Sequence, residues 1–86
     1  MEQKRVISGV VEIDIHGMTK YQAKICLDNL LKKVNHGVYR IRVIHGFHSG
    51  TELKDMVRSN YRKHPKIIRI EMGLNAGISE LVLREL

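Results

Sequence analysis

The sequence predicts an α/β domain, a two-layer β-α-β-α-β-β sandwich with a mostly parallel four-stranded sheet and both helices on one face. Short segments in which apolar and polar residues alternate are separated by longer segments of helical periodicity. This order indicates two successive βαβ units with right-handed crossovers. A parallel sheet covered on both faces would be apolar throughout. The alternation therefore places both helices on one face and leaves the other face polar.

The chain has 86 residues, enough for one domain with a modest core. We expect this domain at residues 10–86, after a loose lead-in at residues 1–9. No apolar run approaches the ~20 residues of a membrane-spanning helix, and residues 1–5 lack the apolar core of a signal peptide. A single cysteine, Cys26, cannot form an internal disulfide. The sequence thus predicts a soluble cytoplasmic protein without a membrane partner.

The first strand and the first helix meet at a glycine. Residues 10–16 alternate between apolar and polar side chains, and Gly17 ends this strand. Thr19 and Gln22 have the spacing of a capping box, and Gly37 is the expected left-handed C-cap of the helix. Apolar residues recur between them at helical spacing, namely Ala23, Cys26, Leu27, Leu30, Leu31 and Val34. The position of the cysteine on this stripe predicts that it belongs to the core.

The remaining elements follow from the same criteria. We expect a strand at residues 39–45, a loop at 46–50 and a helix at 51–64. Two further strands are expected at residues 67–72 and 78–86. Thr51 is the expected cap of the second helix, and Pro65 stops it because the residue before a proline avoids helical geometry. A short helix is the alternative for the last segment.

Parallel strands would bring the C-terminal ends of the first three strands to one edge of the sheet. Glycines follow each of these ends, and both helices begin there. Free backbone N–H groups at helix starts attract anions, and glycine lets a large ligand approach the backbone closely. The polar residues expected at this edge are Asp14, His16, His45, His48, Ser49 and Asn75. This set suits phosphodiester chemistry.

The charge of the chain points in the same direction. The formal net charge is +6, which favours a polyanionic partner, most commonly nucleic acid. Many small basic domains bind no nucleic acid, so the charge alone leaves this open. Arg40, Arg42 and Arg69 are expected on the open sheet face, either as solvated surface or as a patch that binds phosphates.

Two segments resemble signatures of the Smr (small MutS-related) domain family, and the likeness over residues 10–84 is to its stand-alone bacterial type. Asp14-Ile15-His16-Gly17 resembles the D-L-H-G signature. Residues 45–50 resemble the H-G-x-G signature, with His48 in place of the second glycine. The resemblance implies a fold like the C-terminal domain of bacterial translation initiation factor three. It also implies a role on nucleic acid, because members nick DNA or cleave RNA and some act on mRNA at stalled or collided ribosomes.

By position, the resemblance implies that Asp14 and His16 are a catalytic pair. Histidine titrates near neutral pH and can act as base or acid, while Asp14 could orient the imidazole or position a water. The alternative is that Asp14 pairs with Arg42 and His16 only completes the turn. The residues expected to bind nucleic acid or phosphate are His45, Gly46, Phe47, His48, Ser49, Gly50, Arg40 and Arg42.

Several of these residues have a second interpretation. His45 has the parity of the buried face, which favours hydrogen bonds that hold the loop over contact with substrate. Phe47 could stack on a base or cover the edge of the core. His48 either narrows the phosphate cradle or adds a phosphate-binding or acid–base group.

Three functions are therefore considered. The first is an endonuclease that nicks DNA or cleaves RNA, in DNA repair or recombination or in ribosome-associated RNA quality control. The second, which His48 supports, is a non-catalytic nucleic-acid or ribosome-binding module, and the third is a small phosphate-ligand or protein-interaction domain. No spacing typical of a tight metal site is present, although a carboxylate could hold Mg²⁺ loosely without a sequence pattern. No base-reading motif distinguishes DNA from RNA, and no pattern predicts an oligomeric state.

Overall fold

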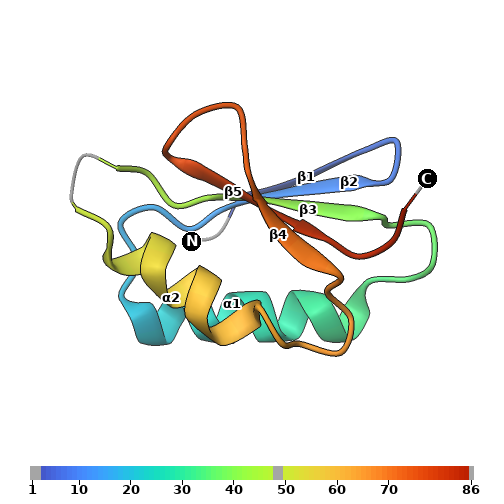
Figure 1. Ribbon diagram of the computed structural model, residues 1–86, viewed down its shortest axis with the longest axis horizontal. Helices are drawn as coiled ribbons and strands as arrows, with labels where there is room; N and C mark the ends of the chain where they lie inside the picture. The colour runs from blue at the N-terminus through green and yellow to red at the C-terminus, as the bar shows by residue number, and fades with distance from the viewer. Residues whose placement is uncertain (1–2, 48–49, 86) are drawn as a thin grey trace.

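The computed structural model describes residues 3–47 and 50–85, which form a sheet with two helices packed on one of its faces (Figure 1). The elements are, in chain order, β1 (Gln3–Ile7), β2 (Val10–Asp14), α1 (Lys20–Lys33), β3 (Arg40–Ile44), α2 (Glu52–Tyr61), β4 (Arg69–Met72) and β5 (Ile78–Val82). The predicted two-layer α/β class and the placement of both helices on one face are confirmed. Neither helix of the described chain is long and apolar enough to cross a membrane.

The sheet differs from the predicted one in the number of strands and in which strands pair. Within the described residues it has five strands in the order β1-β2-β3-β5-β4. Only β2 and β3 pair in parallel, while the other three pairings are antiparallel. The predicted mostly parallel four-stranded sheet is therefore wrong. The physical reason is that β5 turns back after β4 and enters between β3 and β4, so it pairs antiparallel with both.

The fifth strand, β1, lies where the sequence predicts a loose lead-in. It pairs with β2 through the two-residue loop Ser8-Gly9, whose φ angles of +49° and +85° are both positive. Turns of this kind match the twist of a hairpin. A side chain at Gly9 would begin only 2.8 Å from Cδ1 of Tyr39, so this position requires glycine for space as well as for conformation.

The start of α1 is as predicted, but its end is not. Gln22 N donates to Thr19 Oγ1 (3.1 Å) and Thr19 N donates to Gln22 Oε1 (3.0 Å), which completes the capping box. The helix ends at Lys33, and Val34 is its C-cap in an extended conformation. Gly37 has no positive φ, so the predicted left-handed C-cap is wrong.

Helix α2 is shorter than predicted, because it ends at Tyr61 and not at residue 64. Thr51 precedes the helix, but its side chain caps no backbone N–H. Its hydroxyl instead donates to Asp55 Oδ2 (3.0 Å). Glu52 and Asp55 place negative charge in the first turn, which opposes the attraction of a helix start for anions.

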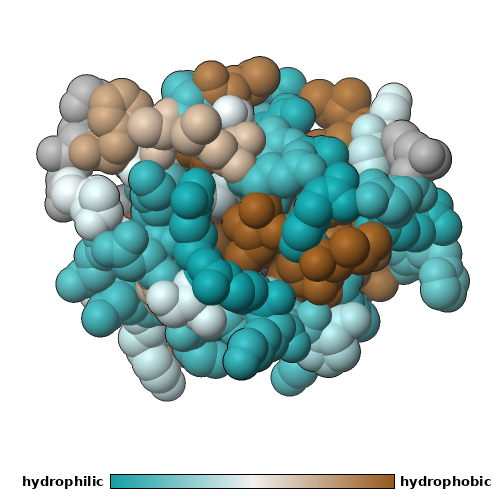
Figure 2. Space-filling model, viewed as in Figure 1, coloured by the Kyte–Doolittle hydropathy of each residue, from teal (hydrophilic) through white to brown (hydrophobic). Residues whose placement is uncertain are grey.

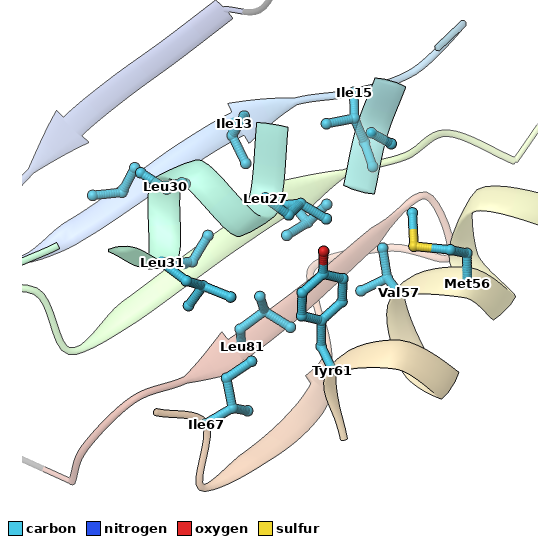
Figure 3. Close-up of a cluster of buried hydrophobic side chains, with 14 residues drawn as sticks. Ile13, Ile15, Leu27, Leu30, Leu31, Met56, Val57, Tyr61, Ile67 and Leu81 are labelled. Atoms are coloured by element: carbon cyan, nitrogen blue, oxygen red, sulfur yellow. The ribbon is translucent and has the colours of Figure 1, made fainter. Parts of the chain in front are cut away.

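The core lies between the helices and the sheet (Figure 3). Its buried members are Val11, Ile13, Ile15, Ala23, Leu27, Leu30, Leu31, Ile41, Val43, Met56, Val57, Tyr61, Ile67 and Leu81. Tyr61 joins the two helices, because its hydroxyl donates to Asp28 Oδ1 at 2.6 Å. Cys26 packs against this core, as its place on the apolar stripe predicts. The packing fixes α1 against β2 and thereby fixes the segment that connects them.

Candidate functional site

The C-terminal ends of β2, β3 and β4 share one edge of the sheet, as predicted. β2 is parallel to β3, and β3 and β4 are both antiparallel to β5, so all three run in the same direction. The loops that follow them leave the sheet toward the left of Figure 1. A Cβ atom on Gly46 would lie 3.5 Å from His16 Cβ, and one on Gly77 would lie 3.3 Å from Gly46 Cα. The three loops are therefore in contact at this edge.

Asp14 and His16 form a hydrogen-bonded pair at the end of β2. Asp14 Oδ1 lies 2.5 Å from His16 Nδ1 and accepts the backbone N–H of His16 at 3.0 Å. A carboxylate only accepts, so Nδ1 carries the proton. The His16 side chain is 68% exposed, and its Nε2 makes no hydrogen bond to the described residues. This nitrogen is thus available to exchange a proton with a ligand. The alternative pairing of Asp14 with Arg42 does not occur, because Arg42 pairs with Glu12 and Glu80.

His45 has a different environment, since its side chain is buried. Its Nδ1 donates to Gly46 O (2.9 Å), because a carbonyl only accepts, and the Ser79 hydroxyl then donates to Nε2 (2.9 Å). The backbone N–H groups of His45 and Gly46 both donate to Gly77 O. His45 therefore holds the loop after β3 against the start of β5, as its parity predicts. Ser79 is part of this arrangement and was missed, although it has the inward parity of its strand.

Burial lowers the pKa of His45 more than the hydrogen bond to Gly46 raises it, and the positive charges of Arg58 and Lys54 lower it further. In the unfolded chain, the His45 imidazole takes up a proton below its ordinary pKa of 6.5, but in the folded domain it resists this protonation. Stability from this group is fully present above that pH and is lost as the pH falls below it, by at most about 1.4 kcal/mol per pH unit. Urea unfolding at pH 7.5 and 5.5 should show a smaller pH dependence for His45→Asn than for wild type. Equal pH dependence in the two proteins would contradict this assignment.

The loop that follows His45 is partly described. Gly46 and Gly50 have φ angles of +78° and +100°, conformations that favour glycine. The predicted site residues His48 and Ser49 lie outside the described residues. Phe47 is 51% exposed, and its ring lies against the loop between β4 and β5, because a Cβ on Gly77 would be 2.9 Å from Phe47 Cδ1. Its ring thus covers part of the edge and still presents half of its surface.

The predicted arginine patch on the open sheet face is balanced by glutamates. Glu80 is 6% exposed and accepts from Arg40 Nη1 (2.5 Å) and Arg42 Nε (3.1 Å). Arg40 also pairs with Glu71 (3.0 Å), and these hydrogen bonds raise the pKa of the Arg40 guanidinium. Arg69 pairs with Glu71 (2.6 Å). The glutamates share the outward parity of the arginines, so the face carries alternating charge in place of a positive field.

Potential metal ligands do not gather in the described part of the chain. Within residues 3–47 and 50–85, no three side chains of histidine, cysteine, aspartate or glutamate lie close enough to hold a metal ion together. Asp14 and His16 alone supply two such side chains, and their nearest atoms already bond to each other.

The fold and the edge define a two-layer α/β domain with an exposed aspartate–histidine pair beside glycine loops. A family model described as the Smr domain matches residues 13–77. The chain belongs to the Smr domain family, a nucleic-acid-binding and nuclease-like family, as its two signature segments predict.

A solved structure has the same fold. The Smr domain of Thermus thermophilus MutS2 superposes with a TM-score of 0.75 and 22% sequence identity, over 86% of this chain and 98% of that chain. No curated protein matches the sequence. At this identity the superposition supports the fold alone.

Proposed function

We propose that this domain is an endonuclease that cleaves phosphodiester bonds in DNA or RNA. The observation that carries the proposal is the pair of Asp14 and His16, in which the carboxylate fixes the ring and leaves Nε2 exposed. Gly46 adjoins His16 with no side chain of its own, so a nucleic-acid backbone can approach the imidazole. The family membership supports a nucleic-acid substrate.

The proposed reaction uses the histidine as a base and then as an acid. His16 Nε2 removes the proton of an attacking hydroxyl, either water or the ribose 2′-OH of RNA, as the new P–O bond forms. Asp14 stabilises the resulting imidazolium through the Nδ1–H hydrogen bond. The P–O bond to the leaving oxygen then breaks, and that oxygen takes the proton from Nε2. Negative charge on the phosphoryl oxygens requires nearby cations or N–H donors.

The cellular setting belongs to the same proposal. An endonuclease of this kind would serve DNA repair or recombination, or act on RNA at the ribosome, and we place it in the cytoplasm. The formal charge of +6 supports association with polyanions of either type.

The test is a cleavage assay with supercoiled plasmid and with single-stranded RNA, each with and without EDTA. Wild type should convert plasmid to the nicked form or shorten the RNA, and the double variant Asp14→Ala/His16→Ala, purified identically, should do neither. Equal activity of the two proteins would exclude the proposed roles. Salt-sensitive binding by wild type without cleavage of either substrate would instead identify a non-catalytic binding module.

A further inference from the structure

A row of basic residues runs along one side of α2. Lys54, Arg58 and Arg62 are spaced four residues apart, which places them on one face of the helix. The row begins in the first turn of α2, directly after the loop that follows β3. Over eight residues a helix advances about 12 Å, so the row extends well away from the edge where His16 lies.

The far end of this row lines a cleft of about 300 Å³ between α2 and the edge strand β4. Its lining residues are Arg58, Arg62, Ile68, Arg69 and Ile70. Figure 2 shows this side of the molecule, where strongly hydrophilic side chains border an apolar area. The cleft thus combines guanidinium groups with apolar walls, a setting that strengthens charge-assisted hydrogen bonds to an anion.

One nitrogen of Arg58, a residue that lines this cleft, lacks a partner among the described residues. Arg58 Nε is buried and makes no hydrogen bond to the described residues. A buried N–H without an acceptor is destabilising, and more so when the group is charged. Arg58 as a whole is only partly buried, and a planar guanidinium matches two oxygens of a phosphate at once, so a phosphate in the cleft can pair with this guanidinium.

The arginines of the domain differ in whether their charge is available. Arg40 and Arg42 are held by Glu80. Arg69 donates through Nε to Glu71 and through both terminal nitrogens to Glu85. Its guanidinium is therefore already paired, which leaves mainly the aliphatic part of the side chain to line the cleft. By contrast, Arg58 and Arg62 pair with no carboxylate in the described part of the chain. Among these arginines, the guanidinium groups without a carboxylate partner therefore belong to α2 and its C-cap and not to the open sheet face.

We propose that the α2–β4 cleft is a second phosphate-binding site, which holds a backbone phosphate of the same nucleic-acid strand whose cleaved bond lies at His16. Arg58 and Arg62 bind the phosphate, and Lys54 continues the row toward the N-terminal end of α2. The inference rests on the proposed nucleic-acid function, but it concerns binding and not the chemical step. Because the site contacts phosphate only, it acts on every base sequence alike.

The experiment measures binding of a fluorescent single-stranded RNA and its DNA counterpart over a series of salt concentrations. The His16→Ala chain is used so that the strands stay intact, and Arg58→Gln/Arg62→Gln is compared with the matched control Lys33→Gln/Arg84→Gln. The cleft variant should bind about tenfold more weakly at low salt, and its salt slope should fall by about 0.7, because one phosphate contact is lost. The control substitutions should change the salt slope by less than half of this amount.

Equal weakening in both variants would overturn the site, because the effect would then come from net charge alone. A second result would also overturn the proposal: inorganic phosphate stabilises wild type but not the cleft variant, while both bind the nucleic-acid strand equally. The cleft would then be a site for a free anion. If Arg58→Gln fails to fold, Arg62→Gln alone, at an exposed position, should still weaken binding and lower the salt slope by part of this amount. Failure of wild type to cleave would sink the proposed function but leave this binding result standing.

Discussion

Replacement of His16 with alanine is expected to lower the cleavage rate by about 10²–10⁴-fold, the usual contribution of a general acid–base group. The domain should stay folded, because the side chain is exposed and contributes nothing to the core. Asp14→Asn should cause a smaller loss, on the order of tenfold, since a neutral amide oxygen still accepts the Nδ1–H but without the charge that strengthens the bond. Single-turnover cleavage of the better substrate measures both effects.

Added imidazole provides a sharper readout of the role of His16. Free imidazole should restore part of the activity of His16→Ala, because the missing group is a base and not a structural contact. His36→Ala is the matched control, since His36 is also exposed and lies after α1, and it should cleave like wild type. A comparable loss in His36→Ala would show that the effect does not come from the pair at the end of β2.

Glu80→Gln is expected to lower the free energy of unfolding by about 2–3 kcal/mol. The carboxylate is nearly inaccessible, and its two oxygens are held by Arg40 and Arg42 respectively. Glutamine has one acceptor oxygen and no charge, so it leaves a half-buried guanidinium facing an N–H group. Breaking one side of a buried ion pair costs more than the pair itself contributes, because the remaining charge stays desolvated.

Urea unfolding at pH 7 measures this loss, with Glu85→Gln as the control. Glu85 also pairs with an arginine, Arg69, but it is exposed, and exposed ion pairs contribute little. Similar midpoints for the two variants would mean that burial at Glu80 does not set the strength of its ion pairs.

Much of the helical layer and of the candidate site could be predicted from the sequence. The alternation before Gly17 predicted β2, and the capping box predicted the start of α1, because both signals are local. Asp14 and His16 were predicted to adjoin on one strand face, and they form a direct hydrogen bond. Local patterns report which side chains share a face, and that was sufficient for this pair.

Strand pairing could not be predicted in the same way. The alternation of residues 78–82 is equally compatible with an edge strand and with insertion between β3 and β4, because both expose one face. Residues 1–9 were predicted as a loose lead-in, although the two residues Ser8-Gly9 between short runs are also a hairpin signal. The ion pairs of Arg40 and Arg42 with Glu12, Glu71 and Glu80 could not be predicted, because they depend on which strands are neighbours.

The insertion of β5 has a consequence for the order of folding. β3 and β4 share no hydrogen bonds, and each pairs with β5. During synthesis, the sheet beyond β3 therefore cannot assemble until residues 78–82 have left the ribosome. The same segment brings Ser79 to His45, and the preceding carbonyl of Gly77 anchors the loop after β3. A nascent chain that stops before Gly77 thus has the signature residues but lacks the contacts that arrange them, so proteolytic resistance and any activity should appear together.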